Sequence, residues 1–227
     1  MFGKNPKRSP ESGDGTLLYV QEIFSTFQGE GPNVGWPAVF LRLGGCNLAC
    51  TFCDTEFESF QAFPLESILN KIQILAGNNG QGGRIRNLVV ITGGEPFRQP
   101  IAPLCGALIE KGFKVQIETN GTLYRPLPKE VEIVCSPKNN NGTGYQPLRQ
   151  DLLEHVTALK FIISAHSDEY REVVDIGQEK WNIPVYVQPM DEYHPEKNKE
   201  NLQYTVKLAL EQGYRVSLQT HKIAEVA

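Results

Sequence analysis

Three cysteines, Cys46, Cys50 and Cys53, lie within eight consecutive positions. Thiolates are the usual protein ligands of iron–sulfur clusters, with one thiolate on each iron. Gaps of three and two residues let a short loop direct three sulfur atoms around one face of a cubane cluster. Three ligands leave one iron open to a small molecule. The spacing therefore predicts a [4Fe–4S] cluster with an open iron rather than a fully ligated electron carrier.

A structural zinc ion is the first alternative, because zinc takes four Cys or His ligands in tetrahedral geometry. Cys105 falls in a helical pattern and Cys135 at a strand end, where free cysteine commonly packs as a small buried residue. No spacing nominates a fourth ligand among the histidines, which are His155, His166, His194 and His221. A zinc-stabilised or electron-carrying Fe–S binding module stays open as a non-enzymatic interpretation.

A second chemical motif, Thr92-Gly93-Gly94-Glu95-Pro96, follows a short apolar run. Adjacent glycines let the backbone approach a ligand closely, and Glu95 can accept a hydrogen bond from an ammonium group. A Gly-Gly pair alone is usually only a turn. Three later apolar runs also end in polar residues, at Glu118-Thr119-Asn120, Ser136-Pro137-Lys138 and Gln188-Pro189-Met190.

The elements that must position these motifs alternate between strands and helices. Short apolar, β-rich runs predict strands at residues 17–23, 38–43, 88–92, 114–118, 131–135, 159–164, 185–188 and 215–219. Helical spacing predicts helices near residues 64–75, 101–111, 167–175 and 200–212, several of them closed by a glycine. Such alternation implies crossover units and a mainly parallel sheet, with ligands at the carboxyl ends of its strands.

The fold class that follows is α/β, a partial, open (β/α) barrel of about six parallel strands with a reduced helical complement. A full eightfold barrel takes roughly 250 residues, more than this chain of 227 supplies. Residues 1–16 are polar and rich in Gly, Pro and Ser, so we expect a flexible N-terminal arm there. Residues 17–227 then form a single domain.

The overall composition excludes some partners. A formal net charge of -4 argues against a generally basic nucleic-acid-binding protein. No apolar run reaches the roughly 18 residues of a membrane span, and the polar N-terminus lacks the apolar stretch of a secretory signal. Three clustered thiols cannot all pair with one another and therefore fit a reducing compartment. We expect a cytoplasmic protein with no membrane or nucleic-acid partner.

The CxxxCxxC loop after a strand, with Phe52 just before its last cysteine and a GGEP segment after the next strand, resembles the radical S-adenosylmethionine (SAM) superfamily. The resemblance implies that the amino and carboxylate groups of SAM chelate the open iron. One electron then cleaves SAM to methionine and a 5′-deoxyadenosyl radical. The positions that it implies for SAM binding are Phe52, Cys53, Asp54, Gly94, Glu95, Ser136, Pro137, Lys138, Gln188, Pro189 and Met190, with Thr119 and Asn120 as further candidates.

Within that superfamily, the segments FQGEG, FLRLGGCNLACTFCDT, VVITGGEP, QIETNGT, SPK, QPM and LQTHK closely resemble the 7-carboxy-7-deazaguanine synthases of queuosine biosynthesis. The resemblance implies conversion of 6-carboxy-5,6,7,8-tetrahydropterin to 7-carboxy-7-deazaguanine with loss of ammonia, assisted by Mg²⁺. It also implies a homodimer and an electron donor such as flavodoxin or ferredoxin. It places substrate at Phe27, Gln28, Gly29, Arg42 and Thr92, with Glu30, Gln219 and His221 as further candidates, and Mg²⁺ at Thr55.

Two of these residues have ordinary structural alternatives. Arg42 is costly to bury without an anionic partner, which would be either a carboxylated substrate or an internal glutamate, Glu22 or Glu30. Thr55 could equally be a helix N-cap. A glycyl-radical enzyme activase would share the cysteines and the GGEP segment. It would leave the FQGEG segment, Arg42 and Thr55 without a role.

Overall fold

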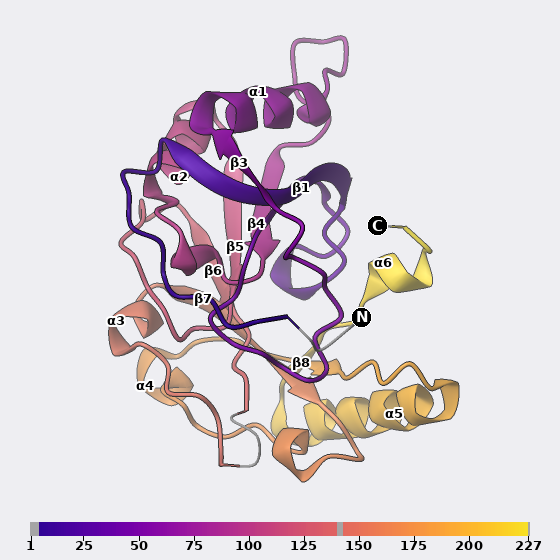
Figure 1. Ribbon diagram of the computed structural model, residues 1–227. Helices are drawn as coiled ribbons and strands as arrows, with labels where there is room; N and C mark the ends of the chain where they lie inside the picture. Colours follow the sequence, from indigo (N-terminus) through magenta and orange to yellow (C-terminus); the bar gives the residue numbers. More distant parts are fainter. Residues whose placement is uncertain (1–4, 140–142, 227) are drawn as a thin grey trace.

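The computed structural model describes residues 5–139 and 143–226, which form one sheet in the order β3-β1-β2-β4-β5-β6-β7-β8-β9 (Figure 1). Strands β2 and β4 to β9 run parallel, while β1 and β3 add an antiparallel edge. The partial, open barrel of about six parallel strands is thereby confirmed. The strands are β1 Leu17–Phe27, β2 Pro37–Leu43, β3 Gln61–Pro64, β4 Leu88–Gly93, β5 Lys114–Thr119, β6 Glu132–Cys135, β7 Val156–Ile163, β8 Val185–Pro189 and β9 Arg215–Val216.

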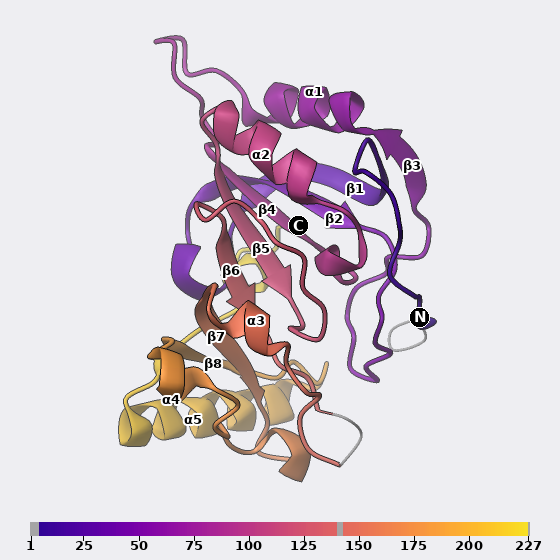
Figure 2. The ribbon, with the colours of Figure 1, turned by 90° about the vertical axis from the view of Figure 1, so that its left-hand side faces the viewer.

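The central strand β4 shows why these runs form parallel strands. Leu88, Val89, Val90 and Ile91 are all fully buried. Val89 and Ile91 join the main core on one face, whereas Leu88 and Val90 pack with Ala38 inside the barrel. Side chains alternate between the two faces of a strand, so one unbroken apolar run buries residues on both faces of the sheet. Helices α1 to α4 lie along the outer face, as Figure 2 shows.

The predicted helices agree with the structure in part. Those near 64–75 and 101–111 form as α1 Leu65–Ala76 and α2 Ala102–Glu110, and the one near 200–212 forms as a longer helix, α5 Pro195–Gln212. The helix predicted over 167–175 is wrong. Only the short turn Asp168–Tyr170 forms there. The segment 167–175 is rich in charged and β-branched residues, and Tyr170 is its one buried side chain, so a longer helix would have no apolar face to pack. Short helices that the sequence did not reveal are α3 Gln150–Leu153, α4 Gln178–Trp181 and α6 Thr220–Ile223.

The N-terminal segment lies against the domain from Asn5 onward, whereas its composition predicts a loose arm. Lys7 forms a parallel bridge with Cys46, and the Glu11 amide donates to the Arg98 carbonyl at 2.7 Å. Its anchors are backbone groups and charged side chains, which a count of apolar residues does not register. Residues 1–4 of the predicted arm lie outside the described part of the chain.

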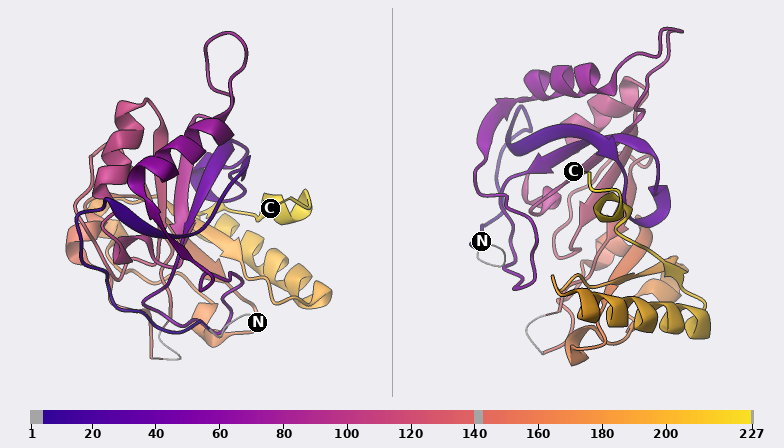
Figure 3. Two further views of the ribbon diagram at one scale, coloured as in Figure 1. Left: turned by 45° about the horizontal axis from the view of Figure 1, so that its top comes forward. Right: turned by 90° about the vertical axis from the view of Figure 1, so that its right-hand side faces the viewer.

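The C-terminal segment returns across the open side of the barrel to the loop after β1 (Figure 3). The strand predicted to reach residue 219 ends at Val216, and the chain then turns away. Both the amide and the hydroxyl of Thr220 donate to the Gly29 carbonyl at 3.0 Å. Within the described residues, no helix has the length and apolar character needed to cross a membrane.

Candidate active site at the carboxyl ends of the strands

A cavity of about 330 Å³ opens at the carboxyl ends of the parallel strands. This is the edge where parallel sheets place their ligands, and the volume falls within the usual range of ligand pockets. All predicted site residues line it except Glu95 and Pro137. Those that do are Phe27, Gln28, Gly29, Glu30, Arg42, Cys46, Cys50, Phe52, Cys53, Asp54, Thr55, Thr92, Gly94, Thr119, Asn120, Ser136, Lys138, Gln188, Pro189, Met190, Gln219 and His221.

The three cysteines of the loop after β2 are free thiols that share this cavity. Burial raises the pKa of Cys46 to about 12 and also raises the pKa of Cys50, so iron binding would release protons. In the described residues, no three His, Cys, Asp or Glu side chains form a group close enough together to hold one metal ion. A [4Fe–4S] cluster takes one thiolate on each iron, so its three ligands need not converge on a single atom.

The GGEP turn touches the cysteine loop through its backbone. The Gly94 amide donates to the Leu43 carbonyl and the Glu95 amide to the Gly45 carbonyl, each at 3.0 Å. A Cβ atom on Gly94 would lie 1.9 Å from the Gly45 oxygen, far inside any tolerated contact. Glycine is therefore needed at position 94, as the sequence predicts for a backbone that approaches another group closely.

Glu95 lies beneath the cavity and has no exposed surface. Its carboxylate accepts hydrogen bonds from the Thr119 hydroxyl (2.7 Å), the Asn120 amide (2.8 Å) and the Phe97 amide (3.0 Å). Burial, only partly offset by these donors, raises the pKa of Glu95 to about 7. The side chain therefore joins the end of β5 to the GGEP turn, whereas the sequence predicts that it accepts from an ammonium group. Pro137 likewise lies outside the cavity lining.

Arg42 and Thr55 face each other at the cavity wall, with Nη1 of Arg42 3.4 Å from the Thr55 hydroxyl. The Glu22 carboxylate lies 3.9 Å from Nε of Arg42 and is more than half exposed, so this internal partner is a weak one. Between Thr55 and β3 the chain forms no helix, which excludes the N-cap alternative for Thr55. The hydroxyl donates to the neighbouring Asp54 carboxylate at 3.2 Å instead.

The sequence prediction missed Lys160, a buried cation on β7 that lines the same cavity. Its ammonium group pairs with Glu30 and, at 3.1 Å, with Glu118. Burial alone would raise the pKa of Glu30, but Lys160 outweighs it and lowers that pKa to about 2. Burial raises the pKa of Glu118 in spite of the same lysine. Arg42 was singled out because it is a charged residue within the apolar run of β2. Lys160 stands within the apolar run of β7 in the same way, so the same signal could have identified it.

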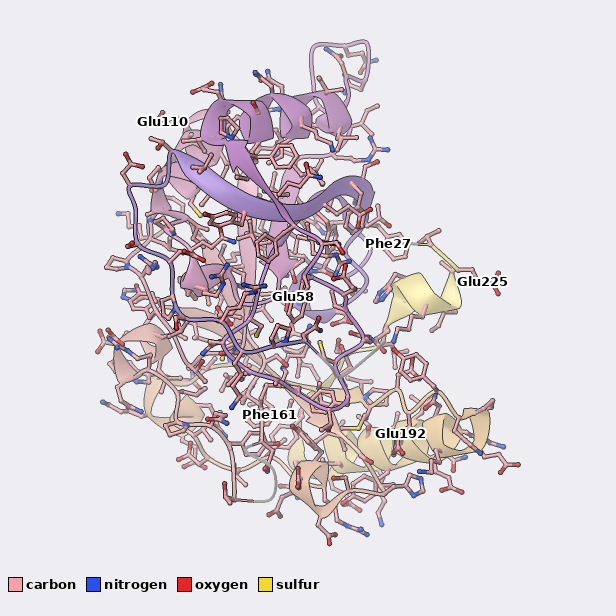
Figure 4. The ribbon with its side chains drawn as sticks, viewed as in Figure 1. Phe27, Glu58, Glu110, Phe161, Glu192 and Glu225 are labelled. Carbon is pink, nitrogen blue, oxygen red and sulfur yellow. The ribbon has the colours of Figure 1, made fainter. Side chains whose placement is uncertain are left out.

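The C-terminal segment completes the rim of the cavity. His221 lies so close to Gly29 that a Cβ there would come 2.2 Å from its Nδ1 atom. Lys222 bridges the cysteine loop and the segment after β8, at 3.3 Å from Asp54 and 2.7 Å from Asp191. Figure 4 shows Phe27, at the end of β1, on the side of the barrel where α6 lies. Asn5 and Asp191 are further lining residues that the sequence did not identify.

Known proteins with similar sequences and structures place the chain in a family. Residues 41–138 match the Radical SAM superfamily. A 7-carboxy-7-deazaguanine synthase from Rickettsia prowazekii is 60% identical over 222 residues, covering 98% of this chain and 94% of its own. One from Rhodospirillum rubrum is 39% identical over 246 residues, covering 100% of both chains. The crystal structure of QueE from Escherichia coli has a TM-score of 0.72 at 25% identity, covering 89% of this chain and 93% of that chain.

The fold and the thiol-lined cavity, together with these matches, define a radical SAM enzyme, which uses S-adenosylmethionine and an iron–sulfur cluster. More narrowly, the chain belongs to the 7-carboxy-7-deazaguanine synthase family and is a lyase of the queuosine pathway. The family predicted from the motifs is confirmed.

Replacing Gly94 by alanine should disrupt the contact between the GGEP turn and the cysteine loop. A Cβ 1.9 Å from a backbone oxygen forces the two loops apart, so we expect Gly94→Ala to lose most of its iron after reconstitution and to unfold at lower urea concentration. Iron per chain and urea unfolding measure both effects. Gly106→Ala on α2 is the matched control, since nothing lies within 4 Å of its Cβ and alanine favours the helix by up to about 1 kcal/mol. Equal iron content in the two variants would contradict the prediction.

The buried Glu95 should make the stability of the protein depend on pH. Its folded-state pKa of about 7 lies above its ordinary value of 4.5, so the folded state binds this proton more tightly. The free energy of unfolding should therefore fall as pH rises from 4.5 to 7, by at most about 3 kcal/mol from this group. Glu95→Gln should flatten that decline in urea unfolding across the pH series, whereas the exposed Glu110→Gln should keep it. An unchanged slope in Glu95→Gln would contradict the prediction.

Proposed function

We propose that the chain converts 6-carboxy-5,6,7,8-tetrahydropterin to 7-carboxy-7-deazaguanine with loss of ammonia. The observation that carries this proposal is the meeting of three free thiols with the Arg42–Thr55 pair in one cavity. Cys46, Cys50 and Cys53 hold a [4Fe–4S] cluster in this proposal. The bound cluster and SAM supply the 5′-deoxyadenosyl radical.

The cofactor side of the cavity is built from the cysteine loop and the ends of β4, β6 and β8. Gly94 exposes backbone for the methionyl part of SAM, and Phe52 offers a ring edge, held by a T-shaped contact with Tyr170 at 5.2 Å. Lys138 is held by the Ser136 hydroxyl and carbonyl at 2.7 and 2.8 Å, where it offers a positive charge to the carboxylate of SAM. Gln188, Pro189 and Met190 complete this side.

The substrate side is built around Arg42 and the buried Lys160. Arg42 binds the carboxylate of the pterin, since the one ion pair of its guanidinium among the described residues is a 3.9 Å contact with the exposed Glu22. Glu118 and Gln28 are joined at 3.3 Å and present oxygen acceptors to the amino and ring N–H donors of the pterin. Lys160 supports Glu118 from below by neutralising part of its charge. Thr92, Phe27 and Gly29 form the surrounding wall, with Gln219 and His221 at the rim.

Thr55 places a hydroxyl oxygen beside Asp54 and Arg42, where a carboxylated substrate would bring further oxygens. Magnesium takes oxygen ligands in an octahedron and usually keeps several waters, so one hydroxyl with substrate oxygens suffices. We therefore assign Mg²⁺ to this position. We further propose a homodimer that works in the cytoplasm and takes electrons from a flavodoxin or ferredoxin.

Anaerobic turnover with product identification tests the function. Reconstituted protein with SAM, reductant and Mg²⁺ should release 7-carboxy-7-deazaguanine and ammonia from the carboxytetrahydropterin. Cys50→Ala should lose the cluster and all activity. Arg42→Ala should lower kcat/KM by at least about tenfold, because a charge-assisted hydrogen bond contributes about 1.5 to 3 kcal/mol. Arg149→Ala, which removes an exposed guanidinium paired with Asp151, is the matched control and should match the wild type.

The outcomes separate the alternatives. Protein that binds about four irons and cleaves SAM, yet leaves the pterin unchanged, would contradict the substrate and favour another radical SAM activity such as a glycyl-radical activase. One zinc per chain without visible absorption would contradict the cluster itself. Full activity in Arg42→Ala would remove the proposed carboxylate contact.

A further inference from the structure

The side chain of Asn5, far from the cysteine loop in sequence, contacts that loop directly. Its Nδ2 atom donates to the Thr55 carbonyl at 2.9 Å and lies 3.8 Å from the Cys53 sulfur, within hydrogen-bond reach of so large an acceptor. One amide nitrogen carries two hydrogens, so both contacts form together. The side chain also lines the cavity.

The segment from Asn5 to Glu11, here called the N-terminal strap, holds this amide in place. The Arg8 amide donates to the Cys46 carbonyl at 2.7 Å, and the Arg8 guanidinium pairs with Glu58 at 2.5 Å beyond the loop. The strap therefore contacts both ends of the cysteine loop, at Cys46 and at Cys53. A side chain so anchored loses little further freedom when it donates to a sulfur atom.

The far end of the strap is tied to the same loop through the buried Arg98. This guanidinium has no exposed surface and donates to the Glu11 carboxylate at 2.6 Å, the Ser9 carbonyl at 3.1 Å and the Gly44 carbonyl at 2.9 Å. Gly44 stands two residues before Cys46. Separating a fully buried cation from its carboxylate is strongly unfavourable, so Arg98 locks the strap to the base of the loop.

We propose that Asn5 is a positioning residue for the iron–sulfur cluster. Its side-chain amide donates an N–H···S hydrogen bond to the Cys53 thiolate, and this bond makes the cluster easier to reduce. This inference rests on the proposed ligation by Cys46, Cys50 and Cys53. Reduction adds negative charge that spreads onto the ligating sulfurs, and a hydrogen-bond donor stabilises the more negative state. Asn120 stands in the same relation to Cys46, with its amide nitrogen 3.8 Å from that sulfur.

The cluster's midpoint potential, measured by redox titration with electron paramagnetic resonance on the reconstituted full chain, tests Asn5 without any turnover. Asn5→Leu keeps the approximate size and removes the donor, and Asn5→Asp replaces the donor by a negative acceptor. At a fixed potential we expect the ratio of reduced to oxidised cluster to fall about tenfold in Asn5→Leu, equivalent to about 59 mV for one electron, and further in Asn5→Asp. Arg8→Ala removes the ion pair with Glu58 but keeps the backbone bond to Cys46 and the Asn5 amide, so it should change the ratio less than twofold.

The outcomes distinguish this inference from the proposed function. If both Asn5 variants show the same cluster midpoint potential as the wild type, the role of Asn5 is overturned and the proposed function is unaffected. An equal shift in Arg8→Ala would assign the effect to strap order and would also overturn it. Failure of the wild-type chain to hold four irons would overturn the ligation and the role of Asn5 together. A thermal midpoint measured on each apo variant confirms that the compared proteins are folded.

Discussion

The close backbone contact between the GGEP turn and the cysteine loop is the constraint on which the rest of the site depends. Leu43 and Gly93 are paired at the ends of the neighbouring parallel strands β2 and β4, so both loops leave the sheet side by side. Two backbone hydrogen bonds then join them where no side chain could fit. The sheet register thereby fixes where the cysteine loop begins, directly beside the GGEP turn.

Three buried charged groups lie under this edge, and each is matched by partners from different elements. Glu95 takes donors from β5 and its own turn, Arg98 joins the strap to the loop, and Lys160 joins β7 to β5 and the loop after β1. Buried charges, even when they are paired, contribute little net stability compared with apolar packing. These groups instead fix the relative positions of the elements that they connect, because each one finds all its partners only when those elements are correctly placed.

The sequence predicted the sheet and most of the cavity because both depend on local signals. Apolar runs such as that of β4 mark parallel strands, and the cysteine spacing marks its own loop. The short edge strand β3, with one half-buried residue and three exposed ones, carries no such run and was missed. The strap was missed because its role depends on partners far along the chain, such as Cys53, which lies 48 residues after Asn5. Local composition cannot register such contacts.

The two ends of the chain complete the site in different ways. The strap reaches the cysteine loop at Cys46 and Cys53, whereas Thr220 and His221 reach Gly29 after β1 and Lys222 reaches Asp54 after the last cysteine. The parallel strands β2 and β4 to β9 form an open barrel, because β1 and β9 do not pair to close the sheet in the described part of the chain. Segments outside the repeating strand and helix units therefore supply the contacts that a full barrel would take from additional strands. It follows that the cavity is complete only when both segments are in place, since Asn5 lines it from one and His221 from the other.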